Sequence, residues 1–590
     1  MNRVLERILV LDGSVPYDGE IVGGKGASIA RMRSLGLSVP PAFVLPVDEC
    51  RRYHAADKSL DDGLWPSVQE GIGMLENETG RRFGDPSAPL LVSVRSGAPV
   101  SMPGMMDTIL NLGINDEVEE GLSALCGDAG FARNTHLRFL REYGGMVMRA
   151  DVDAVSDEAA PAEIRSAIVA DTGVDFPSDP SEQLEAAIQA VFNSWVSRRA
   201  IAYRRHWGIP EDGGTAVVVQ AMVFGNLGSD SGTGVLFTRD PVTGAREMYG
   251  EWLPGGQGDD VVGGAADPLP LAAMAEQLPE AHAELLEAGR LLERENRDVQ
   301  DIEFTVEEGR LYLLQARTAK RSAQAAVRTA VELASEGAID TSTALHRVTP
   351  EQVASVLAPR LSDEVRALAA VLGRGIPACP GVASGRVVLD PDLAEASKAD
   401  VILARPTTSP DDVPAMIAAR GVVTEHGGST SHAAVVTRAL GRPSVLGLGE
   451  GVTSEWEGAE VTVDGSAGVV YAHRLHTTEV HHHDVPPLGT LVDWARQVCP
   501  VEVVHEAPEV LDLDRVGVQF DQDGGLDVEQ IAQHMRGSTA VSGSMLMSAD
   551  GARAVLRSGV STVVCRPGQQ EAVLLLRLVQ ARGQGTKEDT

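Results

Sequence analysis

The stretch GVVTEHGGSTSHAAVVTRALG, Gly421 to Gly441, is the part of the sequence around which the rest can be organised. It opens with an apolar run, breaks at Gly427-Gly428, and continues after His432 as an Ala/Val/Leu segment. This pattern predicts a strand, a glycine-rich turn and a helix that stops at Gly441. His432 would then lie in the first helical turn, where free backbone N–H groups and the helix dipole favour an anion. A neutral imidazole there is a candidate nucleophile toward phosphorus; the alternative is a histidine that only caps or packs the helix start.

Length and composition limit the classes of protein to which the chain can belong. Its 590 residues predict three or four domains with large cores, at roughly 100–200 residues per domain. The 84 acidic and 50 basic residues give a formal net charge of −34, which argues against a surface for nucleic acid or anionic membranes. Five scattered cysteines without a CxxC pair suggest neither a disulfide framework nor a zinc site. We find no signal peptide and no apolar run near the ~20 residues of a membrane span, so we expect a cytoplasmic protein.

Two stretches near the N-terminus carry groups suited to phosphate. The glycine-rich turn Gly23 to Gly26 contains Lys25, one of five lysines in a chain with 45 arginines. Glycines permit close approach of the backbone to an anion and the lysine supplies a point charge. The alternative is an ordinary turn, because the spacing is not that of a P-loop. Arg95 ends a buried-strand pattern and is placed to clamp phosphate oxygens.

The segment QDIEFTVEEGRLYLLQAR, Gln300 to Arg317, predicts a β-hairpin that turns at Glu308-Gly309. Glu303 and Gln315 would face each other on its two strands, so that their oxygens can converge on a hard cation such as Mg²⁺. Arg317 follows two residues later on the same face. As an isolated pattern, an acid and an amide on a hairpin are usually surface residues, so this interpretation depends on the other motifs.

Several motifs together resemble one family. TSHAAVV, Thr430 to Val436, resembles the phosphohistidine loop of the phosphoenolpyruvate-utilising enzymes, in which a swivelling domain carries phosphate between two distant sites. The runs TSPDDVPAM and PACPGVASGRV, which begin at Thr408 and Pro377, are similar to other parts of that domain. SVRSGAPVSMPGMMDTILNLG, Ser93 to Gly113, and GGKGASIARMRSLGLSVPPAF, Gly23 to Phe43, narrow the resemblance to the pyruvate, phosphate dikinase branch.

The resemblance implies an architecture of α/β and α+β domains. We expect an ATP-grasp nucleotide-binding domain, a swivelling phosphohistidine domain and a small C-terminal α/β module. The family's barrel needs at least ~200 residues, whereas about 100 follow Gly489, so the module is expected to be a remnant of that barrel, packed on the swivelling domain or on a second copy of the chain. The expected boundaries are 1–320 for the nucleotide domain with a helical insert at about 116–204, 321–373 for a helical linker, 374–475 for the swivelling domain and 490–590 for the module.

The resemblance also assigns roles to individual residues. His432 would be the phosphorylated nucleophile, and Thr430 matches a position at which plant dikinases are regulated by threonine phosphorylation, although a simple helix cap is the alternative. The oxygens of Glu303 and Gln315 would hold Mg²⁺ as cofactor. The residues expected to bind ATP are Lys25, Arg95, Thr233, Asp260 and Arg317.

Three functions are compatible with these motifs. The first is an ATP-dependent phosphotransferase that phosphorylates its own His432, with ATP, phosphate and pyruvate converted to AMP, pyrophosphate and phosphoenolpyruvate. For the pyruvate step we expect a partner, either a separate barrel subunit or a second copy of the chain. The second is transfer from His432 to another small molecule or protein, and the third is an ATP-binding regulator without transfer. The joint presence of Lys25, Arg95, Glu303, Gln315 and His432 counts against the third.

Overall fold

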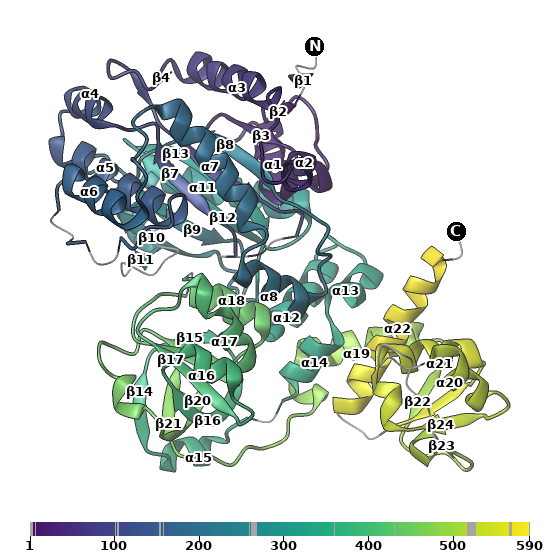
Figure 1. Cartoon of the computed structure of the whole chain (residues 1–590). Helices are drawn as coiled ribbons and strands as arrows, with labels where there is room; N and C mark the ends of the chain where they lie inside the picture. Colours follow the sequence, from purple (N-terminus) through teal and green to yellow (C-terminus); the bar gives the residue numbers. More distant parts are fainter. Residues whose placement is uncertain are drawn as a thin grey trace.

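The computed structural model shows a mixed α/β protein built from several parts (Figure 1). The purple-to-teal N-terminal half ends at Thr318 and is called the nucleotide half after the expected domain. The green part is β-rich and extends from Val371 to Ala472, and the yellow C-terminal module begins at Pro486. The residues that it describes are 4–5, 7–100, 102, 105–152, 155–156, 159–258, 260, 268–358, 360–429, 431–515, 527–565 and 569–588. Within these ranges no helix is both long and apolar enough to cross a membrane.

A six-stranded sheet forms the first layer of the nucleotide half. Its strand order is β1-β2-β3-β8-β6-β7, with the bounds Val4–Leu5, Ile8–Val10, Ala42–Leu45, Ala216–Ala221, Val92–Gly97 and Thr108–Leu112. The strand β8 is buried at every position, which explains why its sequence AVVVQA is apolar except for Gln220. Helices pack on this sheet, and all of them except α1 contribute to the largest apolar core of the molecule, whereas α1 belongs to a second core. Their bounds are α1 Gly19–Ser34, α2 Val47–Ala55, α3 Leu64–Thr79, α4 Asp116–Cys126, α5 Ala129–Met146, α6 Pro161–Thr172, α7 Pro180–Ser194 and α8 Arg198–Trp207. A short pair, β4 Arg82–Phe83 and β5 Pro89–Leu90, follows α3.

A second, five-stranded sheet faces the first and carries the predicted hairpin. Its order is β11-β10-β9-β12-β13, with the bounds Leu269–Pro270, Tyr249–Pro254, Gly232–Phe237, Gln300–Glu307 and Arg310–Thr318. The prediction of a turn at Glu308-Gly309 is confirmed, and both residues have positive φ, 48° and 78°. Helices α10 Ala272–Gln277 and α11 Pro279–Asn296 pack on one face, where Trp252 and Phe304 stack in the core.

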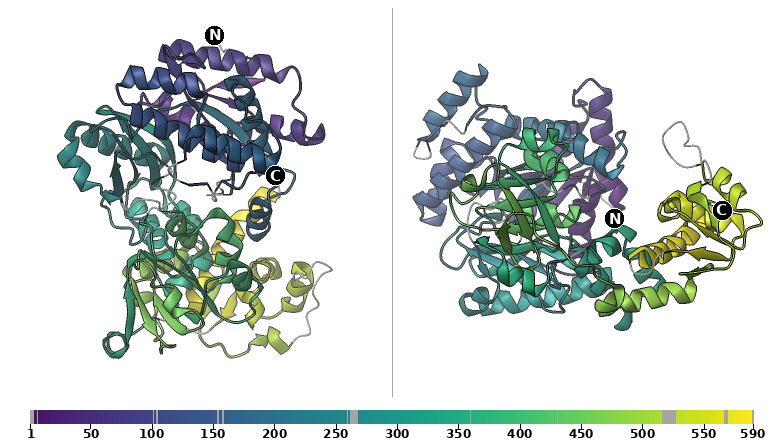
Figure 2. Two further views of the ribbon diagram at one scale, coloured as in Figure 1. Left: turned by 60° about the vertical axis from the view of Figure 1, so that its left-hand side comes forward. Right: turned by 90° about the horizontal axis from the view of Figure 1, so that it is seen from below.

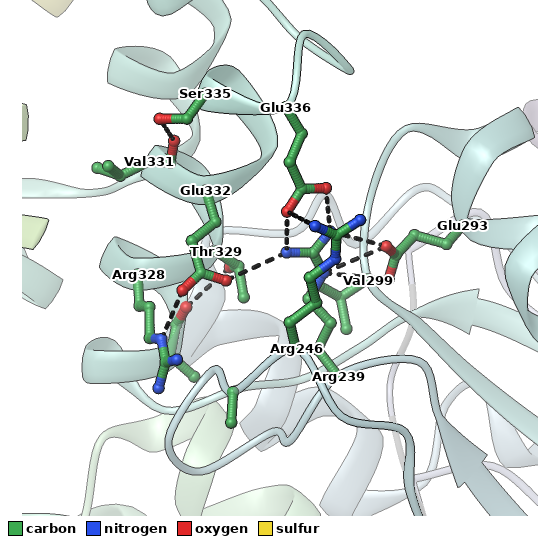
Figure 3. A network of polar contacts seen from close by, with 12 residues as sticks. Arg239, Arg246, Glu293, Val299, Arg328, Thr329, Val331, Glu332, Ser335 and Glu336 are labelled. Atoms are coloured by element: carbon green, nitrogen blue, oxygen red, sulfur yellow. Dashed lines mark hydrogen bonds and ion pairs between the residues drawn. The ribbon is translucent and has the colours of Figure 1, made fainter.

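The chain leaves this half through linker helices that are fixed to it by a buried arginine. Arg239 is 1% exposed and donates to Glu293 on α11 and to Glu332 and Glu336 on α12, Ala323–Ser335 (Figure 3). Three carboxylates around one guanidinium compensate its buried charge, which an unpaired arginine could not achieve without a large cost. The linker continues through α13 Thr341–Arg347, α14 Pro350–Val356 and α15 Asp363–Leu368.

The green part is an eight-stranded sheet of order β14-β21-β20-β16-β17-β18-β19-β15. Its edge strands β14, Val371–Arg374, and β15, Ile376–Cys379, are consecutive in the chain, so the sheet curls until its two edges meet at Gly375. The remaining bounds are β16 Val382–Val388, β17 Val401–Arg405, β18 Gly421–Thr424, β19 Ser444–Leu446, β20 Glu460–Asp464, β21 Val469–Ala472, α16 Pro391–Ala396, α17 Val413–Ala418 and α18 His432–Leu440. The predicted strand and helix around His432 are confirmed as β18 and α18, with Gly441 in the left-handed conformation after the helix.

The two connections to the green part run side by side. Arg360 and Thr478 form an isolated antiparallel bridge, in which each backbone N–H donates to the other residue's carbonyl at 2.9 and 2.7 Å. The segment before β14 and the segment after β21 therefore leave the green part at one point.

The C-terminal module is a small parallel sheet of order β22-β25-β24-β23, with helices around it. Its bounds are β22 Glu502–Val504, β23 Leu511–Asp512, β24 Ala540–Ser542, β25 Thr562–Val564, α19 Pro486–Val498, α20 Val528–Met535, α21 Ala549–Ser558 and α22 Gln569–Glu588. The module lies to one side of the molecule (Figure 2). The module packs on the linker and not, as one expectation had it, on the swivelling domain: apolar side chains of α19 and α22 share a core with α12, α13 and α14, because these faces would otherwise be exposed.

Candidate functional site

The start of α1 brings Lys25 to the end of β6, where Arg95 lies. The helix is broken at Gly23, whose φ of 70° and ψ of 162° are not helical. A Cβ atom at Gly23 would lie 1.7 Å from the carbonyl oxygen of Gly97, so only glycine permits this approach. Gly24 N–H donates to the carbonyl of Ala98, which fixes the turn against the strand end.

Four of the residues expected to bind ATP and its metal gather between the two sheets. Arg95 Nη2 donates to Glu303 Oε2 at 3.0 Å, and Arg317 Nη2 lies 3.9 Å from Glu303 Oε1. Burial, with Arg95 beside it, holds the pKa of Lys25 well below its usual value. Burial opposes the ionised form of Glu303, but Arg95, Arg317 and Lys25 together lower its pKa. This concentration of positive charge suits a polyanion, which would stabilise the charged form of Lys25.

The hairpin places Gln315 directly opposite Glu303, as predicted, with a bulge between Glu303 and Phe304. Asp301 lies opposite Arg317 and accepts a hydrogen bond from its Nε at 2.8 Å. Burial raises the pKa of Asp301, and its Oδ1 has no hydrogen-bond partner among the described residues. Asp301 was missed in the sequence, although its position two residues before Glu303 puts it on the same face.

Thr233 and Asp260 are placed differently from the Lys25 group. The Thr233 hydroxyl donates within the sheet to the carbonyl of Phe304 at 3.0 Å. Asp260 forms an ion pair with Arg138 of α5 at 2.9 Å and accepts from the backbone of Gln257. In the described ranges, neither side chain forms a hydrogen bond or an ion pair with Lys25.

The register of the strands places further polar groups, beyond Asp301, Glu303, Gln315 and Arg317, on the same face of the five-stranded sheet. Residues directly opposite each other in neighbouring strands share a face. Val235 of β9 lies opposite both Glu303 of β12 and Glu251 of β10. Phe237 lies opposite both Asp301 and Tyr249. The face that carries the candidate metal ligands therefore continues to Tyr249 and Glu251, which sequence reasoning did not single out.

The loop before α18 lies against this face, and α18 is at the edge of the green part nearest the nucleotide half (Figure 1). Glu251 Oε1 accepts hydrogen bonds from the Ser429 backbone N–H at 3.0 Å and from its hydroxyl at 2.5 Å. The hydroxyls of Tyr249 and Ser429 also share a hydrogen bond. These contacts hold the phosphohistidine-like loop on the sheet. Thr430, the candidate regulatory residue, lies outside the described residues.

His432 begins α18 and is 8% exposed. Its Nδ1 lies 3.3 Å from the Thr408 hydroxyl, whereas its buried Nε2 has no partner among the described residues. Burial lowers the pKa of His432 to about 4, with Asp412 acting against the shift and Arg199 of α8 adding to it. The imidazole is therefore neutral at physiological pH, and Nε2 is free to act as a nucleophile or to bind a ligand.

Oxygen donors on the sheet fit a hard cation. Glu303 and Gln315 face each other, and the unpartnered Asp301 Oδ1 lies on the same face, so the donor set is the one that Mg²⁺ prefers. A second group of potential ligands, Asp116, Glu119 and His136, lies on α4 and α5. Its carboxylates are paired with Arg165 and Arg133, so their charges are already compensated.

Two segments of the chain match protein-family models. Residues 59–278 match the model described as pyruvate phosphate dikinase, AMP/ATP-binding domain, and residues 397–468 match the PEP-utilising enzyme, mobile domain. The second segment contains His432.

Curated relatives match over most of the chain. Pyruvate, phosphate dikinase 1, chloroplastic, of Oryza sativa subsp. japonica is 46% identical over 530 residues, which are 83% of this chain and 55% of the relative. Pyruvate, phosphate dikinase of Rhizobium meliloti (strain 1021) is 43% identical over 528 residues, 81% of this chain and 58% of the relative. Pyruvate, phosphate dikinase 2 of Zea mays is 42% identical over 532 residues, 83% of this chain and 59% of the relative. The chain thus spans somewhat more than half the length of these relatives.

Proposed function

Because the chain shares the AMP/ATP-binding domain and the mobile domain of the pyruvate, phosphate dikinases, we propose that it is an ATP- and Mg²⁺-dependent phosphotransferase that phosphorylates its own His432. The observation that carries this proposal is the state of His432. A neutral imidazole with a buried, unpartnered Nε2 starts a helix that docks on the sheet face bearing Glu303, Gln315 and Arg317. A core histidine would have both ring nitrogens satisfied.

We assign ATP to the space between the two sheets, as in an ATP-grasp domain. Lys25 and Arg95 come from the first sheet and its helix, and Arg317 comes from the second. Their positive charges bind and orient the phosphates and stabilise charge that develops during transfer. Thr233 and Asp260 belong to the outer part of this site, where they position the strands and loops around the nucleotide.

We assign Mg²⁺ to Glu303 and Gln315, with Asp301 beside them. When bound, the ion would neutralise phosphate charge and fix the geometry of the phosphates. Arg95 and Arg317 hold the Glu303 carboxylate ionised and in place for this role.

His432 attacks through Nε2, and a hydrogen bond from Nδ1–H to the Thr408 hydroxyl would select the tautomer with a free lone pair on Nε2. The helix start provides free N–H groups next to the incoming phosphoryl group. Thr430, two residues earlier, is the proposed site of regulation: a phosphate there would repel the incoming group.

The full cycle that we propose converts ATP, phosphate and pyruvate to AMP, pyrophosphate and phosphoenolpyruvate. Residues 1–320 act as the nucleotide domain, 321–373 as the linker, 374–475 as the swivelling domain and 490–590 as an accessory module. Swivelling is supported by the bridge of Arg360 and Thr478, because both connections of the domain bend at one place. Transfer to pyruvate takes place away from the nucleotide site, after the swivelling domain has moved.

The test is product analysis with ATP and phosphate carrying different labels, with and without pyruvate. We expect AMP and pyrophosphate from a single turnover without pyruvate, and continued turnover only when pyruvate is present to accept the phosphoryl group. Formation of ADP, or of products in the His432→Ala variant, would contradict the proposal.

A further inference from the structure

Arg438 on α18 is a buried cation held by carbonyl oxygens, with the buried carboxylates of Asp301 and Glu251 near it but not paired with it. It is 3% exposed, and no carboxylate lies within ion-pair distance of it in the part of the chain that the structure describes. Its partners are carbonyl oxygens: Nη1 donates to Ser429 at 2.8 Å and to Ala378 at 3.5 Å, and Nε donates to Lys320 at 3.3 Å. Nη2 is buried and has no partner in the same part of the chain. A guanidinium in this state is costly unless something else compensates its charge.

The side chain extends toward the candidate nucleotide site. Helical side chains incline toward the N-terminus of their helix, and Arg438 reaches back to Ser429 at the start of α18. Its guanidinium lies 5.7 Å from the centre of the Phe237 ring on the five-stranded sheet. Phe237 is opposite Asp301 in the sheet, and the Asp301 and Arg438 charges act on each other. Arg438 therefore faces the strand that carries Asp301 and Glu303.

Where α18 faces the five-stranded sheet, one hydrogen-bond donor and one acceptor on opposite sides have no partner among the described residues. Arg438 Nη2 is a donor on the mobile side, and Asp301 Oδ1 is an acceptor on the nucleotide side. They do not form an ion pair with each other, although the charge of each is felt by the other. A phosphate group with its cation offers both signs of charge at once, so one such ligand would satisfy both atoms.

We propose that Arg438 is a substrate-binding arginine that the mobile domain carries into the nucleotide site, where Nη2 binds an oxygen of the phosphoryl group transferred to His432. This inference rests on the proposed function and adds a residue to it. In the transfer, Nε2 of His432 forms a bond to the β-phosphorus of ATP, the bond from that phosphorus to the α–β bridging oxygen breaks, and its electron pair leaves with AMP. Inorganic phosphate then attacks the γ-phosphorus and departs as pyrophosphate, and the β–γ bridging oxygen keeps its electron pair on the single phosphoryl group that remains on His432. Arg438 makes and breaks no covalent bond; its charge stabilises the oxygens of the phosphoryl group.

The arrangement also couples docking to ligand occupancy. Docking without an anion buries the Arg438 charge uncompensated, whereas docking onto bound phosphate pairs it. By linkage, phosphate in the site strengthens docking, and docking strengthens the binding of phosphate. A purely structural role, in which Arg438 only holds the Ser429 carbonyl through Nη1, leaves Nη2 unused and makes no such link.

The first experiment measures single-turnover phosphorylation of His432 at saturating ATP, phosphate and Mg²⁺. The variants are Arg438→Gln, Arg438→Lys and the control Arg442→Gln. Arg442 is a matched control because it is also partly buried on the mobile domain, but its Nη2 donates to the Ile417 carbonyl of that same domain. We expect Arg438→Gln to slow the step by at least about 100-fold, Arg438→Lys to recover part of the loss, and Arg442→Gln to keep the wild-type rate.

The second experiment measures how docking depends on a bound anion. A purely structural role of Arg438 would not affect this dependence. Hydrogen exchange of the segment 431–440 is followed with and without the Mg²⁺ complex of β,γ-imido-ATP. In the wild type we expect protection to rise with the nucleotide, and in Arg438→Gln we expect this increase to be lost. Equal rates in Arg438→Gln and wild type, or an equal increase in protection, would overturn the proposal. Absence of labelling in the wild type itself would instead overturn the proposed function.

Discussion

At the scale of the residue, the account depends on the protonation state of His432. Its pKa is about 4 because burial disfavours the charged ring, against 6.5 for an exposed histidine. We call the protein docked when the loop before α18 lies on the five-stranded sheet. Because docking lowers the pKa of His432, His432 favours docking fully at any pH above the pKa that it has in the undocked state. The contribution then decreases as pH falls from 6.5 toward about 4.

The pH dependence of phosphorylation tests this state. We expect the single-turnover rate to stay constant from neutral pH to well below 6.5. It should fall only as the pH approaches about 4, the pKa of His432 in the docked state. The measurement is the initial rate of labelling, quenched in alkali, because phosphohistidine is labile in acid. A midpoint at the value of an exposed histidine would show that His432 is not buried when it reacts.

Glu303 is the residue on which the metal assignment depends. Glu303→Gln removes a proposed metal ligand and also the partner of Arg95, so that Lys25, Arg95 and Arg317 lose a counter-charge. We expect a loss of roughly 100-fold or more in the rate of His432 phosphorylation and a higher Mg²⁺ requirement. Glu308→Gln, in the exposed turn of the same hairpin, is the matched control and should keep the wild-type rate. Equal losses in both variants would contradict the assignment.

At the scale of the element, the docking of α18 depends on β10. Glu251→Ala would leave the buried Ser429 N–H without its acceptor, at a cost of about 1–3 kcal/mol in docking. We expect faster hydrogen exchange over 431–440 and slower self-phosphorylation, without loss of the fold. Glu247→Ala, exposed just before β10, is the control. If exchange were the same in both variants, the Glu251 contact would not hold the docked state.

The elements also show how far sequence reasoning reached. The sequence predicts the hairpin, and it also predicts the strand and the helix around His432. Turn glycines, the periodicity of apolar residues and helix caps are signals within a short stretch of sequence. The pairing of Glu303 with Gln315 followed from the same hairpin. Asp301, two residues before Glu303 on the same strand, could have been found from the hairpin as well, whereas Glu251 depends on the order β10-β9-β12-β13, which joins segments distant in the chain. Likewise, the Asp260 ion pair requires Arg138 from α5, whose position only tertiary packing determines.

At the scale of the whole molecule, the linker joins the nucleotide half to the C-terminal module. The green part packs on the nucleotide half, and its two chain connections pass together through the bridge of Arg360 and Thr478. Arg239 fixes α12 to the nucleotide half, and the core shared by α12, α14, α19 and α22 fixes the module to the linker. The C-terminal residues were expected elsewhere because their apolar periodicity shows which faces are buried but not which element covers them.

Arg239 therefore has a global role that can be tested. Arg239→Met removes the ion-pair partner of Glu293 and leaves Glu332 and Glu336 only the more exposed Arg328 and Arg246. We expect a loss of about 3–5 kcal/mol in the free energy of unfolding. Arg246→Met is the matched control, because Arg246 also contacts Glu336 but its side chain is 71% exposed. Its loss should stay below about 1 kcal/mol. Denaturant unfolding of both variants gives the comparison, and similar losses would contradict the role of Arg239.

The central claim is tested most directly by locating the phosphoryl group after one turnover. The protein is mixed with Mg²⁺, phosphate and ATP labelled at its β and γ phosphates, digested under alkaline conditions and analysed by mass spectrometry. The account predicts one alkali-stable, acid-labile phosphoryl group on Nε2 of His432, absent from His432→Ala and formed together with AMP. A phosphoryl group on another residue, or undiminished labelling of His432→Ala, would contradict it.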